Sequence, residues 1–278
     1  MRLENEQDLR SAEKVRAGLR TRYVGQTLYY WPAVGSTNDE LKRLADEGAP
    51  EGALAIADEQ VTGRGRLDRS WVAPAGSSLL MSLLFRPAFL APVEAQQLTM
   101  ICSLAAADAV VQVTGLQPAL KWPNDLILEG RKLAGVLTEL GFATEAGPSG
   151  AALAWAIVGV GLNVNVDFAA PAFRRDWPDL AGTAISLQMA AGRPISRLRL
   201  LHSYLLAVEM RYTALRAGQS PHAEWAGRLA TLGRPVTVST PDGQHQGIAQ
   251  GVDETGALLL RRPDGQVVRI LAGDVMLR

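Results

Sequence analysis

The chain has little of what structural metal sites and disulfide-stabilised folds require. Its 278 residues include one cysteine and three histidines. A single cysteine excludes an intrachain disulfide and is typical of a reducing compartment. Cys102 falls in an apolar stretch, residues 98–113, so we expect it to be a small buried hydrophobe. His202, His222 and His245 are scattered without ligand spacing, and a structural zinc site is therefore not expected.

An excess of charge of one sign is also missing. Lys+Arg and Asp+Glu total 28 each, so no overall field attracts nucleic acid or an anionic membrane. The first sixteen residues are charged and lack an apolar core, and we expect no run of membrane-spanning length. Neither a GxxxxGK[ST] phosphate loop nor a GxSxG nucleophile motif occurs. These absences predict a cytoplasmic protein that binds neither DNA nor membrane.

The sequence does contain apolar runs of helical and strand type, in an order typical of a mixed protein. Strands are predicted over residues 53–60, 78–85, 121–128, 132–140 and 154–166, helices at 36–47, 94–114 and 195–215, and a turn cluster at 144–150. After Gly233, short β runs separated by Pro-Asp-Gly turns predict a small antiparallel barrel. We therefore expect an α+β fold. Its predicted parts are a polar extension (1–22), a mixed β-sheet packed with helices (23–230) and a small β-domain (231–278).

An arginine-rich loop, residues 63–71 with the sequence GRGRLDRSW, follows the strand predicted over 53–60. Arginine binds phosphate or carboxylate with two hydrogen bonds, and glycine allows backbone N–H groups to approach an anion. The loop therefore predicts an anion site, with an ordinary solvated turn as the alternative. Because its like charges have no apolar anchor, we expect residues 62–70 to be mobile without a ligand.

Three further polar clusters interrupt apolar runs: KWPND at 121–125, GRKLAGVLTE at 130–139 and GVGLNVN at 159–165. Pro123 is expected to break the strand ladder and expose its polar neighbours. Lys132 is either an exposed strand-end lysine or a point charge for a carboxylate or phosphate oxygen. Glycines in the third cluster would admit a planar ligand, and strand alternation would put Asn163 and Asn165 on one face; an ordinary strand end is the alternative. Without a nucleophile, such a site suits positioning and charge stabilisation.

Taken in order, these segments closely resemble biotin protein ligases. The matching stretches are STND at 36–39, EQVTGRGRLDRSW at 59–71, PAGSSLLMSLLF at 74–85, KWPNDLIL at 121–128, GRKLAGVLTEL at 130–140 and VGVGLNVN at 158–165, and residues 233–260 resemble the family's small SH3-like domain. The resemblance implies an ATP-dependent ligase without a bound prosthetic group. Biotin and MgATP would form biotinyl-5′-AMP, and biotin would pass to one lysine of a biotin carboxyl carrier domain, such as that of acetyl-CoA carboxylase.

The resemblance also implies roles for individual residues. Those implied to bind biotin are Ser36, Thr37, Asn38, Gln60, Gly63, Arg64, Lys132 and Gly135. Those implied to bind ATP or the adenylate are Arg64, Arg66, Trp71, Asn124 and Asn163. The implied catalytic residues are Lys132, Arg66 and Asp125, with Lys132 as the chief electrophilic stabiliser. Mg²⁺ would arrive with ATP rather than bind a protein cluster.

Two departures from the family pattern matter. Leu67 and Asp68 replace Arg-Gly of the frequent loop sequence GRGRRGR, which puts the charge and backbone freedom of the loop in question. Only 35 residues precede Ser36, too few for the winged-helix DNA-binding domain of many relatives, so we expect no repressor function. The alternatives are a lipoate–protein ligase and a non-catalytic regulator that binds biotinyl-AMP. Relatives often dimerise, so a homodimer is possible.

Overall fold

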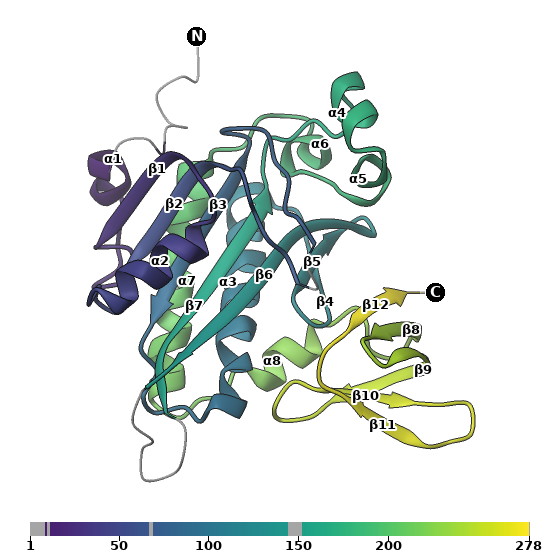
Figure 1. The fold of residues 1–278 in the computed structure, drawn as a ribbon. Helices are drawn as coiled ribbons and strands as arrows, with labels where there is room; N and C mark the ends of the chain where they lie inside the picture. The colour runs from purple at the N-terminus through teal and green to yellow at the C-terminus, as the bar shows by residue number, and fades with distance from the viewer. Residues whose placement is uncertain (1–8, 10–11, 67–68, 144–151, 278) are drawn as a thin grey trace.

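A seven-stranded mixed sheet forms the centre of the computed structural model, which describes residues 9, 12–66, 69–143 and 152–277 (Figure 1). Its strands, in spatial order, are β1 (Leu28–Val34), β2 (Leu54–Gln60), β3 (Ser78–Phe85), β7 (Leu153–Asn163), β6 (Arg131–Phe142), β5 (Asp125–Leu128) and β4 (Ala119–Lys121). β1 and β2 run parallel, and the other neighbouring pairs run antiparallel. The predicted mixed sheet is confirmed.

Helices cover both faces of this sheet. α3 (Gln96–Thr114) and α7 (Arg197–Arg216) pack together on one face, and α2 (Thr37–Asp46) lies on the other (Figure 1). All eight residues of β3 are buried because both of its faces are covered, which explains its unbroken apolar sequence. α2 covers a separate small core that includes Leu41 and Ile157. The layers around β3 are therefore a continuous hydrophobic core on one side and a smaller one on the other.

Helix α3 is the central core helix. It ends where the sequence predicts, at Gly115, whose left-handed φ of 79° favours glycine. Residues 92–114 are long and apolar enough to cross a membrane by length and composition, contrary to our expectation, but most of them are buried inside the fold. Cys102 is fully buried here, as predicted, and burial raises the pKa of its thiol to about 12. The burial of most of residues 92–114 and of Cys102 indicates that α3 is a core helix of the fold.

Several short helices were not predicted. They are the 3-10 helix η1 (Pro92–Glu94), α4 (Pro171–Asp176), α5 (Pro178–Thr183), α6 (Leu187–Ala191) and α8 (His222–Gly227). Another short helix, α1 (Ala12–Ala17), agrees with the helix-permissive sequence of residues 1–20, for which a frayed helix was one of two alternatives. α1 corrects the expectation of a merely polar extension, because Leu9 and Val15 are fully buried. The following turn is held by Glu209 of α7, whose carboxylate accepts backbone N–H groups of residues 22–24. Residues 1–8 and 10–11 lie outside the described part of the chain.

The C-terminal residues form a second, five-stranded antiparallel sheet. Its spatial order is β11 (Val267–Ile270), β10 (Leu258–Arg261), β9 (Gly243–Val252), β8 (Pro235–Thr240) and β12 (Asp274–Leu277). This sheet contacts the first through Trp122, which is 1% exposed and whose Nε1 donates to the Gly256 carbonyl at 2.8 Å. The predicted small β-unit is confirmed as a separate antiparallel sheet; the domain boundaries stay predictions.

One predicted strand is wrong as a single element. Residues 121–128 split into β4 and β5, because the turn at Trp122, Pro123 and Asn124 interrupts the ladder, as the proline alone suggested. The strand predicted to reach residue 166 ends instead at Asn163. The turn cluster predicted over residues 144–150 lies outside the described residues. The turn between β4 and β5 is important because it carries a polar side chain into the site.

Candidate functional site

A cavity of about 610 Å³ opens between the two sheets, which is within the usual size range of small-molecule sites. It gathers almost all of the residues singled out in the sequence: Ser36, Thr37, Asn38, Gln60, Arg64, Arg66, Trp71, Asn124, Asp125, Lys132, Gly135 and Asn163. Gly63 is the exception. Its carbonyl accepts the backbone N–H of Trp71 at 2.9 Å, and it lines a neighbouring hollow on the arginine loop. Their binding and catalytic roles stay predictions.

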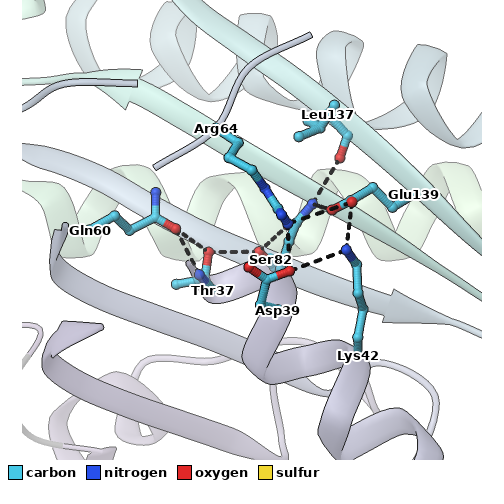
Figure 2. Close-up of polar contacts among 9 residues, drawn as sticks. Thr37, Asp39, Lys42, Gln60, Arg64, Ser82, Leu137 and Glu139 are labelled. Atoms are coloured by element: carbon cyan, nitrogen blue, oxygen red, sulfur yellow. Dashed lines mark hydrogen bonds and ion pairs between the residues drawn. The ribbon is translucent and has the colours of Figure 1, made fainter. Parts of the chain in front are cut away.

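One end of the cavity, which we call the amide end, lies at the start of α2 and is lined by Thr37, Asn38 and Gln60. Ser82 and Glu139 belong to it as hydrogen-bond partners of these residues (Figure 2). Gln60 Oε1 accepts from the backbone N and the Oγ1 of Thr37, at 2.7 and 2.9 Å. Ser82 Oγ lies 2.7 Å from Thr37 Oγ1 and 2.6 Å from Asn38 Oδ1, and Asn38 Nδ2 donates to Glu139 at 2.6 Å. These groups are largely buried and hold one another in place.

Sequence reasoning missed Ser82 and Glu139. Ser82 stands between Met81 and Leu83 in β3, and Glu139 is the acidic residue of β6. A polar side chain within a mainly apolar segment was the available signal. Also missed were the segment around α5 and the residues at the start of β12, which line the cavity from elsewhere in the chain: Phe168, Leu180, Gly182, Thr183, Ala184, Gly273, Asp274, Val275 and Met276. No local pattern in the sequence marks these as neighbours of the arginine loop.

The opposite end, which we call the cationic end, consists of Lys132, Asp125, Arg66 and Asn124. Lys132 Nζ lies 2.7 Å from Asp125 Oδ1, and the lysine side chain is 41% exposed. It therefore lines the cavity rather than being buried in the sheet. Asn124 is fixed by a hydrogen bond from its Nδ2 to the Val136 carbonyl. The cationic end therefore presents two cations to the cavity: Lys132, which is paired with one carboxylate, and Arg66, which contacts neutral groups.

A β-bulge turns Lys132 toward the cavity. β5 and β6 pair Leu126 with Ala134 and Ile127 with Lys132, which leaves Leu133 as an extra residue on β6. Simple alternation would put Lys132 on the face of Ala134, which packs in the main core. The extra residue reverses the alternation, and bulges commonly redirect a side chain beside a functional site. Strand periodicity alone could not have predicted this orientation.

Each described arginine of the loop has a polar or charged partner, although the loop was predicted only to lack an apolar anchor. Arg64 Nη2 contacts Asp39 at 2.5 Å, and Arg69 Nη2 contacts Asp274 at 2.7 Å. Arg66 Nη1 donates to Asn124 Oδ1 at 3.3 Å and to the Gly273 carbonyl at 3.4 Å. Burial lowers the pKa of Arg66 from its usual value, although nearby carboxylates oppose this. Leu67 and Asp68 lie outside the described residues, and the mobility of the loop stays a prediction.

The glycines of β6 and β7 accommodate protein side chains, whereas their role in admitting a planar ligand stays a prediction. Gly135 and Gly161 pair across the two strands, and a Cβ on Gly161 would lie 2.5 Å from Cε2 of Trp71. A Cβ on Gly159 would likewise lie 2.3 Å from Asn38 Oδ1. The glycines therefore provide the space in which the Trp71 indole and the Asn38 amide sit against the sheet.

Asn163 and Asn165 do not act together in the cavity, contrary to the prediction that strand alternation puts them on one face. β7 ends at Asn163, which lines the cavity. Asn165 lies beyond the strand, and its side-chain amide exchanges two hydrogen bonds with the backbone of Ile195. Asn165 is therefore a structural residue. In the described ranges no group of three or more His, Cys, Asp or Glu side chains could hold a metal ion.

Comparison with known proteins agrees with this geometry. Residues 30–163 match the Biotin/lipoate A/B protein ligase family, and residues 231–278 match the Biotin protein ligase C terminal domain. The chain is 34% identical over 271 residues to the Bifunctional ligase/repressor BirA of Bacillus subtilis (strain 168), covering 96% of this chain and 79% of the relative. It is 36% identical over 237 residues to a Biotin--[acetyl-CoA-carboxylase] ligase of Paracoccus denitrificans, covering 84% and 93%.

A solved structure shares the fold. The biotin protein ligase from Aquifex aeolicus, in complex with biotin and ATP, superposes with a TM-score of 0.72 at 27% identity. The likeness covers 91% of this chain and 99% of that one, so it includes both sheets. Family matches, sequence identity and fold lead to the same conclusion: this chain belongs to the biotin protein ligase family.

Proposed function

We propose that this protein activates biotin with MgATP as biotinyl-5′-AMP and transfers the biotinyl group to a lysine of a biotin carboxyl carrier domain. The observation that carries the proposal is that one cavity contains both the buried amide end and the two cations Lys132 and Arg66. The amide end offers neutral donors and acceptors for a cyclic urea. The cationic end suits the charged carboxylate and phosphate.

In the first step, a biotin carboxylate oxygen attacks the α-phosphorus of ATP. A P–O bond forms, the bond to the β-phosphate oxygen breaks, and pyrophosphate leaves. Negative charge grows on the α-phosphate oxygens, so preorganised cations lower the barrier. Lys132 is the main stabiliser in this proposal, with Arg66 holding the phosphate by charge-assisted hydrogen bonds. Asp125, 2.7 Å from Lys132 Nζ, orients the lysine.

In the second step, the amine of an acceptor lysine attacks the biotinyl carbonyl carbon, an amide bond forms, and AMP leaves. The attacking amine must lose a proton, and the Asp125 carboxylate is the candidate group at the cationic end that could accept it. Trp71, Asn124 and Asn163 would belong to the nucleotide side. Mg²⁺ would arrive bound to ATP and neutralise phosphate charge.

Lipoate ligation and non-catalytic binding of biotinyl-AMP are the alternatives. The family matched by residues 30–163 includes both biotin and lipoate ligases, whereas the C-terminal match and the named relatives concern biotin. We propose the cytoplasm as the location and an acetyl-CoA carboxylase or similar carboxylase as the source of the acceptor. The absence of repressor function and the possible homodimer stay predictions.

The decisive experiment is incubation of the protein with biotin, MgATP and a carboxyl carrier domain, followed by mass measurement of the carrier. One added biotin per carrier is expected, together with release of pyrophosphate. Replacing biotin by lipoate, or omitting ATP, should abolish the added mass. Labelling with lipoate instead would favour the first alternative. Binding of biotinyl-AMP without any labelling would favour the regulator.

A further inference from the structure

Arg64 lies in a different environment from Arg66, two positions along the same loop. Its Nη2 is 2.5 Å from Asp39 Oδ1 and 3.6 Å from Glu139 Oε1 (Figure 2). Asp39 belongs to the first turn of α2, and Glu139 belongs to β6. Arg66, in contrast, contacts Asn124 at the cationic end. The two arginines therefore reach toward different parts of the cavity wall.

The charges around Arg64 are balanced locally. Lys42 Nζ completes the cluster, 3.2 Å from Asp39 Oδ1 and 2.5 Å from Glu139 Oε1. Two cations thus face two carboxylates, with no net positive charge left over. A guanidinium in ion pairs with carboxylates offers less to a further anion than an unpaired one. Arg66, in contrast, hydrogen-bonds to neutral groups, the Asn124 amide oxygen and the Gly273 carbonyl, and its charge has no direct carboxylate partner.

Position along β6 agrees with this separation. The Lys132 side chain extends along β6 to Gly135, where an added Cβ would lie 3.4 Å from its Cε. The cationic end is therefore about four residues, or roughly 13 Å, from Glu139 on the same strand. Arg64 contacts the Glu139 region, whereas Lys132 and Asp125 mark the cationic end. A side chain held near Glu139 is poorly placed to contact an anion beside Lys132.

Glu139 connects this ion cluster to the cavity wall. Its Oε1 faces Lys42 and Arg64, while its Oε2 accepts from Asn38 Nδ2 at 2.6 Å. Asn38 is buried, and with its Nδ2 directed at Glu139, its Oδ1 is left to accept from Ser82. A single carboxylate therefore fixes both the start of the arginine loop and the orientation of an amide in the pocket.

We propose that Arg64 is a positioning residue and not an anion ligand: Asp39 and Glu139 hold it, and thereby fix the start of the arginine loop beside the biotin ring site, while Glu139 orients Asn38. This inference rests on the proposed function, because it assigns a part to residues of that same site. Arg64 would then not bind the carboxylate or phosphate of the ligand, as the family resemblance implies, but would support the part of the cavity that surrounds the biotin ring.

Biotin and biotinol, the alcohol that lacks the carboxylate, distinguish the two roles. We would titrate both into the wild type and into Arg64→Ala, Asp39→Asn and Glu139→Gln by calorimetry. A positioning role predicts that each substitution weakens both ligands equally, by about three- to tenfold for Arg64→Ala and less for the others, since partly exposed ion pairs are individually modest. The ratio of biotin to biotinol affinity stays at the wild-type value.

Two results would overturn the inference. If Arg64→Ala weakened biotin much more than biotinol, Arg64 would be a carboxylate ligand. If Asp39→Asn left biotin binding unchanged or strengthened it, the contact between Asp39 and Arg64 would not support biotin binding. The double variant Arg64→Ala/Asp39→Asn is expected to lose less than the sum of the two single variants, because both changes break the contact between Arg64 and Asp39. Fully additive losses would contradict the shared role.

Controls keep this test separate from folding and from the proposed function. Glu40→Gln removes an ion pair with Arg43 on the same helix, away from the loop, and should leave both affinities unchanged. Lys132→Ala should lower the ratio of biotin to biotinol affinity, since it removes a charge at the carboxylate end. If the wild type bound neither ligand, the proposed function itself would fail, a different outcome from an altered ratio in the Arg64 variant.

Discussion

The two ends of the cavity hold their polar groups in different ways. At the amide end, Thr37, Asn38, Gln60 and Ser82 hydrogen-bond to one another and are mostly buried. At the cationic end, Lys132 is 41% exposed and has Asp125 as its ion-pair partner. One end is a rigid network of mainly neutral groups, and the other consists of charges whose partners a ligand could replace.

This difference indicates a division of labour. A network of satisfied, buried hydrogen bonds is ordered before the ligand arrives, which reduces the entropy lost on binding and favours selection of one ring. Charges near solvent retain the freedom to exchange a protein partner for a phosphate oxygen, which is what stabilisation of a reacting centre requires. Substitutions at the two ends should therefore affect different steps.

The largest effect is expected from Lys132→Ala. In the proposed function this change deletes the main stabilising charge at the reacting centre, and we expect biotinyl-AMP formation to slow by roughly 10²-fold or more. Pyrophosphate release in the presence of biotin and MgATP measures the step directly. Arg43→Ala, an exposed change on α2, is the matched control. A near-normal rate in Lys132→Ala would remove the distinction between the two ends.

Gly161→Ala tests the indole that lies between them. The added Cβ would meet Trp71 at 2.5 Å, and overpacking of this kind costs about 1–3 kcal/mol. We expect the KM for ATP to rise about tenfold or more, with a smaller change for biotin. Gly182→Ala is the control, because this glycine also lines the cavity but has no atom within 4 Å of an added Cβ. Equal behaviour of the two variants would show that Trp71 is not needed on the nucleotide side.

Arg66→Gly should act on retention of the intermediate more than on its formation. The variant loses the guanidinium that contacts Asn124 and Gly273 and, in the proposed function, the phosphate. We expect bound biotinyl-AMP to dissociate about tenfold faster or more. The half-life of the complex after gel filtration measures this. An unchanged half-life would move Arg66 out of the cationic end as a functional group.

The smallest expected effect is on stability, at Asp253→Asn in the turn that supports the cationic end from outside. Gly256 of this turn accepts the hydrogen bond from Trp122, two residues before Asn124. Burial would raise the pKa of Asp253, but hydrogen bonds from Thr255, Arg269 and the backbone of Ala257 outweigh it and lower the pKa to about 2. The folded state therefore favours the ionised carboxylate.

A carboxyl group whose pKa is lower in the folded than in the unfolded state stabilises the fold at pH values above its unfolded-state pKa. This stabilisation is lost as the pH falls through the folded-state pKa. The contribution of Asp253 should thus be complete above about pH 5 and disappear between about pH 4 and pH 2. Because solvent screens this surface turn, we expect it to amount to about 1 kcal/mol or less. Urea unfolding of Asp253→Asn and wild type at several pH values checks this. The ratio of biotin to biotinol affinity should not change. A stability difference that persisted at pH 2 would contradict the assignment.

Much of the fold follows from local pattern. The run Ser78–Phe85 predicts a strand, and Gly115 predicts the end of the long core helix, because an apolar run and a left-handed φ are local properties. The short helices around residues 171–191 escaped prediction, since six-residue helices are stabilised by the surfaces against which they pack. The split between β4 and β5 was visible only as the strand-breaking Pro123.

The sequence alone determined the family resemblance, the α+β class and a set of candidate site residues of which all but Gly63 line the cavity, because these depend on residue types and their order. Tertiary structure decided how those residues are used. The bulge at Leu133 turns Lys132 toward Asp125, and the carboxylates of α2 and β6 engage Arg64. Glu139 lies 101 residues from its partner Asn38 along the chain, and only folding brings such groups within hydrogen-bonding distance. Charge pairing across that separation has no local signature in a sequence.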